Sequence, residues 1–216
     1  MPEVQTLDEL LKNLDDMKKY EGMGKFSRHG DNYCDVMMHK VPLSREVDRY
    51  EFISDKCKGK VVLDIGPVGH LHDDIKQKAK KVYGIDLKKI EEDTFEIDLD
   101  RIDKTAQELL GEVLPQIEIV VCGEIVEHLS NPGRFLDWLA EGFKVPVIFS
   151  VPNAWGEYQV TFLSEGVENV NKDHVAFYSY TTFKTLMSRS GFKISEFYWY
   201  KGVPYFAEGL IFVAQT

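Results

Sequence analysis

The chain has 216 residues, of which 44% are hydrophobic and 29% are charged. This length accommodates one substantial α/β domain, whereas a second independent core would be cramped. The formal net charge of -10 argues against a large basic face for nucleic acid, although a local basic pocket stays open.

Cysteine content and hydropathy indicate the compartment in which the protein works. Cys34, Cys57 and Cys122 form no Cys-x-x-Cys pair, which is typical of reduced thiols in a cytosolic protein. No apolar run approaches the ~18 residues that a membrane helix needs, and the N-terminus lacks the pattern of a signal peptide. We therefore expect a soluble, cytoplasmic protein without membrane contact.

A helical extension is predicted over residues 1–59, before the main domain. Apolar residues at helical spacing predict an amphipathic helix over residues 4–20, which could pack on the sheet edge, cover a ligand or form a homodimer contact. Residues 25–43 are predicted to form a loop, either a surface connection or a cover over substrate. Ser44 as an N-cap predicts a helix over residues 45–56.

The main domain, predicted over residues 60–216, is organised around the run Val-Val-Leu-Asp-Ile-Gly that begins at residue 61. Its apolar start predicts a strand buried on both faces, and Asp64 follows near the end of that strand. Gly66 and Gly69 then allow a sharp turn and a close approach to a ligand. A helix predicted from residue 71 places free backbone N–H groups beside the strand, which is the outline of a nucleotide-cofactor crevice.

A second strand that ends in an acid indicates which kind of cofactor the crevice would bind. The strand predicted over residues 81–86 ends in Asp86, where the ribose-binding carboxylate of a parallel neighbour belongs. Pro67 removes one N–H donor from the turn, which favours a cofactor without phosphates over a dinucleotide. In these two strand ends the sequence resembles the class I S-adenosylmethionine-dependent methyltransferases.

The remaining elements fit this resemblance, because helices and strands alternate and the chain ends in two strands joined by a short turn. Further strands are predicted over residues 95–99, 117–121, 145–151, 192–200 and 208–214, and helices over residues 71–80, 105–110, 132–142 and 181–190. The resemblance implies a doubly wound, Rossmann-like seven-stranded sheet with a C-terminal antiparallel hairpin and helices on both faces.

The resemblance also implies S-adenosylmethionine as the cofactor. Asp98 is expected at the adenine amino group with Leu99 against the ring, and the rival interpretation of Asp98 is a solvated acid. The expected cofactor-binding residues are Asp64, Gly66, Pro67, Gly69, Asp86, Leu87, Asp98, Leu99, Cys122 and Gly123. The loop after Asp64 lacks the family's middle glycine, so a cofactor-binding protein with a decayed active site is an alternative.

A cluster of acids and histidines follows the fourth strand. If the chain is helical there, Glu124, Glu127 and His128 share one face. The segment resembles the Glu-x-x-Glu-His motif of ubiquinone-pathway O-methyltransferases and small-RNA 3′-terminal 2′-O-methyltransferases, and His174 matches a later histidine of the RNA enzymes. This implies a Mg²⁺ or Mn²⁺ site made of all four residues. Without a metal, His128 or His174 removes the proton of a hydroxyl, and Glu127 belongs to the same catalytic group.

The predicted function is O-methylation of a hydroxyl on a small molecule or glycan. A long insertion over residues 154–172 contains Trp155, Tyr158 and Phe162, which either contact the substrate or pack in the core. Metal-dependent 2′-O-methylation of RNA is the alternative activity, and the acidic balance of the chain opposes nucleic acid as a partner.

Overall fold

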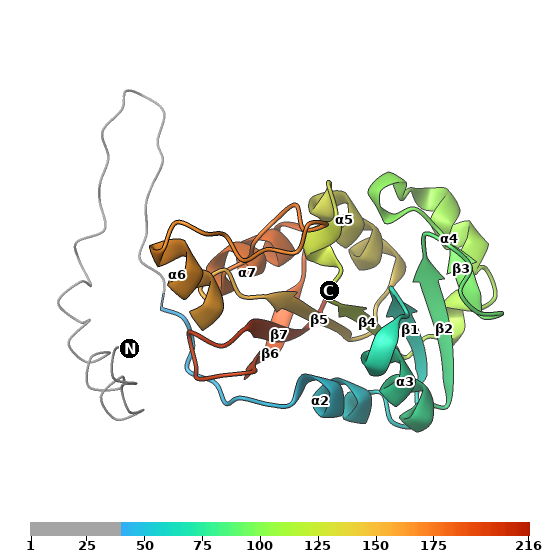
Figure 1. Cartoon of the computed structure of the whole chain (residues 1–216). Helices are drawn as coiled ribbons and strands as arrows, with labels where there is room; N and C mark the ends of the chain where they lie inside the picture. The colour runs from blue at the N-terminus through green and yellow to red at the C-terminus, as the bar shows by residue number, and fades with distance from the viewer. Residues whose placement is uncertain (1–39) are drawn as a thin grey trace. The chain divides into compact units, whose positions relative to one another are not determined.

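A seven-stranded sheet forms the centre of the part of the chain that this computed structural model describes, residues 40–216 (Figure 1). In chain order the strands are β1 Val61–Ile65, β2 Lys81–Asp86, β3 Thr94–Glu96, β4 Ile119–Gly123, β5 Val147–Pro152, β6 Lys193–Tyr200 and β7 Gly209–Gln215. Their order in space is β3-β2-β1-β4-β5-β7-β6, and β7 runs antiparallel to both of its neighbours. The predicted seven-stranded Rossmann-like sheet with a C-terminal hairpin is confirmed.

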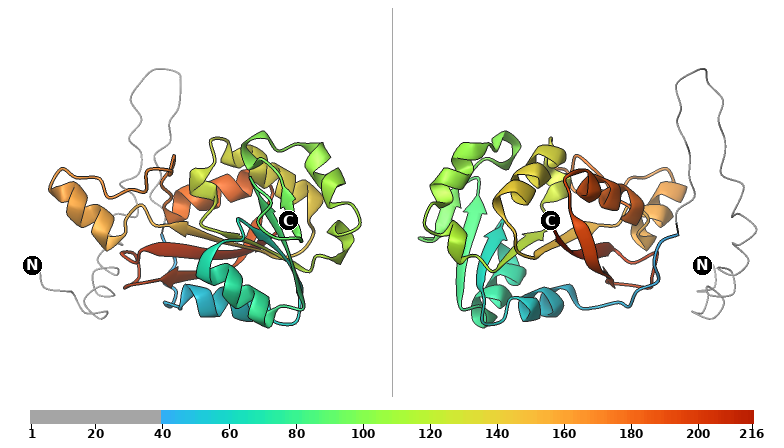
Figure 2. Two further views of the ribbon diagram at one scale, coloured as in Figure 1. Left: turned by 45° about the vertical axis from the view of Figure 1, so that its right-hand side comes forward. Right: turned by 180° about the vertical axis from the view of Figure 1, so that it is seen from behind.

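Helices cover both faces of this sheet. The α-helices are α2 Arg49–Lys56, α3 Gly69–Lys78, α4 Lys104–Leu110, α5 Pro132–Gly142, α6 Glu157–Ser164 and α7 Tyr180–Arg189, and short 3₁₀ turns are η2 Leu99–Arg101, η3 Leu114–Gln116 and η4 Val126–His128. Figures 1 and 2 show α2 and α3 on one face and α5 and α7 on the opposite face. None of these helices is long and apolar enough to cross a bilayer.

The central strands are apolar throughout because their successive side chains enter two different cores. Ile148 of β5 packs in the cluster that α2 and α3 complete. The next residue, Phe149, points to the other face, where its ring centroid lies 5.7 Å from that of Phe183 on α7. Both side chains are fully buried, and truncation of such a phenylalanine to alanine costs about 3–5 kcal/mol.

The strand order creates the crevice in which a ligand can bind. The chain builds outward from β1 through β2 to β3 and then crosses back to place β4 on the other side of β1. The connections that leave β1 and β4 therefore diverge, and parallel sheets bind ligands at the carboxyl ends of strands at such a switch point.

The start of α2 differs from the prediction. Its N-cap is Asp48, whose carboxylate accepts a hydrogen bond from the Glu51 N–H at 2.9 Å. Ser44, the predicted cap, instead donates to the Phe197 carbonyl, and Val47 N–H donates to the Trp199 carbonyl at 2.8 Å. The predicted helix start at residue 45 was wrong because residues 44–47 run beside β6.

Other elements also differ from the prediction, several of them by a few residues in their bounds. The third strand ends at Glu96 rather than residue 99, because Asp98 caps η2 by accepting from the Asp100 N–H at 3.0 Å. The insertion at 154–172 contains the helix α6, which the sequence analysis did not predict.

The compact unit that contains the sheet runs from Leu43 to Thr216 and includes α2, whose Ile53 and Cys57 are buried in the core. The boundary predicted between residues 59 and 60 stays a prediction. The helix predicted over residues 4–20 and residues 25–39 of the predicted loop lie outside the described residues.

Candidate active site

A cavity of about 420 Å³ opens at the carboxyl ends of β1 and β4, and we call it the cofactor cavity. Gly66 and Gly69, both with φ of +73°, form part of its lining. The left-handed backbone favours glycine at Gly66, and a Cβ there would also displace the end of the Ile125 side chain. The same lining includes Asp64 and Gly123, so the structure brings these four predicted residues together.

Asp64 is held by a histidine that the sequence analysis did not single out. The carboxylate is only 3% exposed and lies 2.8 Å from the Nδ1 atom of His72 on α3. Burial raises the pKa of Asp64, while the hydrogen bond with His72 opposes that rise. His72 Nε2 lies 3.8 Å from Glu91 and makes no hydrogen bond, so the imidazole stands between two carboxylates.

Two other predicted cofactor residues lie behind the wall of the cavity. Pro67 is buried and packs against β2, where a Cβ on Gly84 would come within 2.7 Å of its ring. Cys122 is fully buried in β4, and burial raises the pKa of its thiol well above the ordinary value. These residues support the shape of the wall.

Four predicted residues lie outside the lining of the cofactor cavity. Asp86 accepts a hydrogen bond from the Lys88 N–H at 3.3 Å, and Leu87 beside it is 63% exposed. Asp98 caps η2, while Leu99 is buried. Their roles in ribose and adenine binding stay predictions.

Arg49, the first residue of α2, supplies a cation that the sequence analysis missed. Its Nε donates to the Ser150 hydroxyl at 3.0 Å, and its Nη1 lies 3.1 Å from a Glu124 carboxylate oxygen. A Cβ on Gly123 would lie 3.3 Å from Nη2, so the guanidinium spans the end of β4. No motif marks this residue, because only the fold brings the helix start to the strand end.

Glu124 does not adopt the predicted helical position. Its φ is +59°, and the helical turn that follows covers only Val126–His128. Its carboxylate pairs with Arg49 and accepts a hydrogen bond from the Tyr200 hydroxyl. The prediction that Glu124, Glu127 and His128 share one helical face was therefore wrong.

Glu127, His128 and His174 do come together, with ligand atoms all within 4.8 Å of one another. The rings of His128 and His174 meet edge to face, with centroids 4.6 Å apart, and His128 Nδ1 lies 3.1 Å from the Asp173 carbonyl. Burial, followed by the nearby His128, lowers the pKa of His174. Burial raises the pKa of Glu127 to about 8, and neither of its carboxyl oxygens has a hydrogen-bond partner.

The residues of this trio fit a divalent cation. Bonds of ~2.1 Å place two ligand atoms on one ion at most ~4.2 Å apart, so a small closure would bring all three into range. The unpaired, buried oxygens of Glu127 are what a carboxylate ligand without its ion would show. Glu124 is already engaged by Arg49 and Tyr200 and does not belong to the group.

Two more cavities adjoin the cofactor cavity. One, of about 510 Å³, shares Glu124, Asn171 and His174 with it, and we call it the acceptor cavity. The other, of about 340 Å³, shares Arg49, Tyr50 and Glu124. A ligand in the acceptor cavity would reach the cofactor cavity at His174.

Comparisons with known proteins agree with this arrangement. A family described as "Methyltransferase domain" matches residues 38–196, which is well over half of the chain. No curated protein matches the sequence.

Solved structures share the fold at low sequence identity. The small RNA methyltransferase HEN1 superposes with a TM-score of 0.60 at 15% identity, over 82% of this chain but only 27% of that chain. An S-adenosylmethionine-dependent methyltransferase from Clostridium acetobutylicum ATCC 824 gives 0.56 at 11% identity, over 77% of this chain and 89% of its own. Magnesium protoporphyrin IX methyltransferase from Synechocystis PCC 6803, solved with bound S-adenosylhomocysteine (SAH), gives 0.54 at 13% identity, over 77% and 81%.

The sheet order, the glycine turn beside Asp64 and the family match lead to the same conclusion. The chain belongs to the methyltransferase-domain family and has the fold of the class I S-adenosylmethionine-dependent methyltransferases.

Proposed function

We propose that the protein transfers a methyl group from S-adenosylmethionine to a hydroxyl oxygen of a small molecule or glycan. The observation that carries this proposal is the position of His174, which lines both the cofactor cavity and the acceptor cavity. His128, in the turn η4 after β4, meets it edge to face and lines the cofactor cavity. A proton acceptor is therefore available where the two ligands would meet.

The two imidazoles suit the removal of a hydroxyl proton. If His128 Nδ1 donates its proton to the Asp173 carbonyl, Nε2 carries a free lone pair. The lowered pKa of His174 keeps that ring neutral near pH 7 and able to accept a proton. S-adenosylmethionine, when bound, supplies a methyl group on a positively charged sulfur. As the oxygen–carbon bond forms and the sulfur–carbon bond breaks, the hydroxyl proton passes to an imidazole.

Asp64, Gly66, Gly69 and Gly123 would hold the cofactor at the strand ends, since they line the cavity there. Arg49 adds a guanidinium next to Gly123. The amino-acid end of the cofactor has a carboxylate, and a charge-assisted hydrogen bond to a guanidinium suits it.

The test combines binding and turnover. The wild-type protein should bind SAH in a calorimeter and transfer labelled methyl to a hydroxyl acceptor. His174→Ala should lower kcat by about 10²–10⁴-fold, the usual contribution of a general base, and leave SAH affinity within a few fold. Gln116→Ala, outside the lining of the three cavities, is the control. Full activity in His174→Ala and in His128→Ala would refute a base role, and absence of SAH binding would favour a decayed active site.

A second candidate is metal-dependent 2′-O-methylation of an RNA end. The grouping of Glu127, His128 and His174 supports it, as does the likeness to a small RNA methyltransferase, while the net charge of -10 opposes it. Transfer to a short RNA that requires Mn²⁺ or Mg²⁺ and is lost with a 2′-deoxy 3′ end would favour this candidate.

A further inference from the structure

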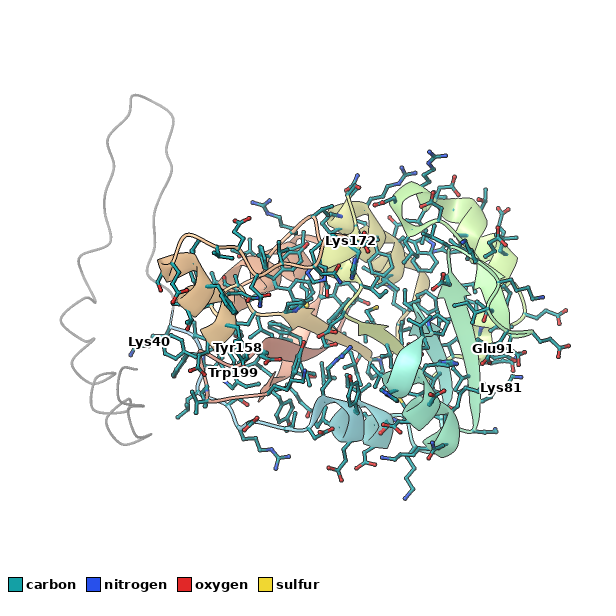
Figure 3. The ribbon with its side chains drawn as sticks, in the orientation of Figure 1. Lys40, Lys81, Glu91, Tyr158, Lys172 and Trp199 are labelled. Atoms are coloured by element: carbon teal, nitrogen blue, oxygen red, sulfur yellow. The ribbon has the colours of Figure 1, made fainter. Side chains whose placement is uncertain are left out.

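The acceptor cavity has a lining that points to one class of ligand. It lies between the insertion, which supplies α6 and the loop after it, and the end of β6. Figure 3 shows Tyr158 on the α6 side of the molecule, away from Lys81 and Glu91 beside β2. A cavity of about 510 Å³ is within the ~300–1,000 Å³ typical of small-molecule sites.

Three amide side chains, Gln159, Asn169 and Asn171, belong to its polar lining. Asn169 Nδ2 donates to Gln159 Oε1 at 3.2 Å, and Asn171 Oδ1 accepts from the Asp173 N–H at 3.1 Å. These contacts leave amide N–H donors on Gln159 and Asn171 and a carbonyl acceptor on Asn169 for a ligand. A ligand that fits must offer several groups that both donate and accept, as hydroxyls do.

The charged residues of this lining are two carboxylates, Glu124 and Glu208, and one ammonium, Lys201, and each takes part in an ion pair. Lys201 Nζ lies 3.2 Å from a Glu208 carboxylate oxygen, and Glu124 is paired with Arg49. The lining therefore carries one more carboxylate than cation, because Arg49 lies outside it. A phosphorylated ligand or an RNA backbone would meet this excess negative charge and compete with Glu208 for Lys201, which an uncharged ligand avoids.

Aromatic surface is available beside the amides. Tyr158 is 57% exposed, so it can offer an apolar ring face as well as its hydroxyl. Tyr200 lines the same cavity but is only 2% exposed, and its hydroxyl donates to Glu124. A sugar ring has this mixed character, with hydroxyls around its edge and C–H groups on its faces. His174 and Asn171 form the border with the cofactor cavity, where the methylated hydroxyl would lie.

We infer that the acceptor cavity binds an uncharged sugar ring, either a free monosaccharide or the terminal residue of a glycan. This inference rests on the proposed function, because it names the acceptor of that reaction. Its lining differs from that expected for a phenol, which needs few hydrogen bonds, and from that expected for RNA, which needs unpaired cations.

The test measures binding apart from turnover. Saturation-transfer NMR is run with the full chain, with and without SAH, on methyl glycosides of glucose, galactose, mannose and rhamnose, on catechol, on glucose 6-phosphate and on a short RNA. At least one uncharged glycoside should bind in preference to catechol, the phosphorylated sugar and RNA. Preference for any of those three, or binding by no glycoside, overturns the inference. Failure of the proposed function is seen separately, as a lack of SAH binding or of labelled methyl transfer.

Variants then locate the binding site. Asn169→Ala and Gln159→Ala should each weaken the preferred glycoside about threefold to tenfold, the effect of one lost hydrogen bond, and raise KM with little change in kcat. SAH affinity should not move. Thr161→Ala, on the same helix but outside the cavity lining, is the matched control. Unchanged glycoside affinity in both amide variants would place the sugar elsewhere and refute the assignment.

Discussion

The guanidinium of Arg49 lies 3.1 Å from the carboxylate of Glu124, and this pair joins the start of α2 to the end of β4. The arginine side chain is only 11% exposed, so the pair is partly withdrawn from water. It gives the cofactor cavity a fixed cation and takes Glu124 out of the acidic group that the sequence suggested.

Replacement of Arg49 should weaken cofactor binding. We expect Arg49→Met to remove the charge-assisted hydrogen bond proposed for the amino-acid carboxylate of the cofactor, which is worth about 1.5–3 kcal/mol, so the Kd for SAH should rise at least about tenfold. Calorimetry checks this. Glu124→Gln, which keeps the guanidinium, should raise the Kd less. An unchanged Kd in Arg49→Met would show that the carboxylate binds elsewhere.

Loss of His72 should destabilise the fold in a pH-dependent way. His72→Leu leaves Asp64 buried without its partner, and breaking a buried pair costs about 3–5 kcal/mol. Because burial already raises the pKa of Asp64 above 3.8, the folded state keeps this proton longer than the unfolded state. The free energy of unfolding therefore falls as pH rises from 3.8 through the raised pKa. Without the hydrogen bond from His72, which lowers the pKa of Asp64, this fall continues to higher pH.

Urea unfolding at pH 5 and pH 8 measures this effect. The difference between wild type and His72→Leu should be larger at pH 8. The double variant Asp64→Asn, His72→Leu carries no buried charge there, so it should recover part of the stability and show less pH dependence. Equal losses at both pH values would contradict the explanation.

Gly84→Ala should disturb the turn over residues 66–69, because Gly84 on β2 packs against Pro67. A Cβ at Gly84 would lie 2.7 Å from the Pro67 ring and 3.2 Å from the Thr94 hydroxyl, and overpacking of this kind costs about 1–3 kcal/mol. Thermal unfolding should show a lower Tm, and SAH affinity should fall with it. At Gly133 in α5 an added Cβ would lie 3.9 Å from its nearest neighbour, the Asn131 Oδ1 atom, so Gly133→Ala should leave the Tm unchanged or higher. If Gly84→Ala has the same Tm as the wild type, the turn over residues 66–69 shifts without cost to make room for the added Cβ.

Chelation separates the two candidate chemistries. We expect methyl transfer to continue in EDTA, because proton transfer to an imidazole needs no cation. If the metal-dependent candidate holds instead, EDTA should abolish activity and Mn²⁺ should raise the Tm of the wild type. Glu127→Gln would then lose that rise, whereas Glu124→Gln, whose carboxylate lies outside the trio, would keep it.

The elements that the sequence predicted best have a clear local pattern and at least some buried side chains. The strand predicted from residue 61 is β1, the strand predicted over residues 81–86 is β2, and the helix predicted over residues 132–142, with Pro132 in its first turn, matches α5 in both bounds. In these segments the conformational preferences of the residues agree with the pattern of burial, because the spacing of apolar residues and the capping residues specify the same structure.

The failures arise where distant contacts override the local pattern. Ser44 is a residue type that often caps helices, yet backbone hydrogen bonds of residues 45 and 47 with Trp199 hold the chain in an extended conformation there. Glu124 sits at a spacing that suits a helical face, yet its left-handed backbone and the contacts with Arg49 and Tyr200 take it elsewhere. Neither partner is close in sequence, so no local pattern could have revealed them.

Glu124 lines all three cavities, so a single carboxylate forms part of each wall. A ligand that shifts this side chain in one cavity changes the shape and charge that the other two present. Thermodynamic linkage makes any such effect mutual: the factor by which SAH alters acceptor affinity must equal the factor by which the acceptor alters SAH affinity.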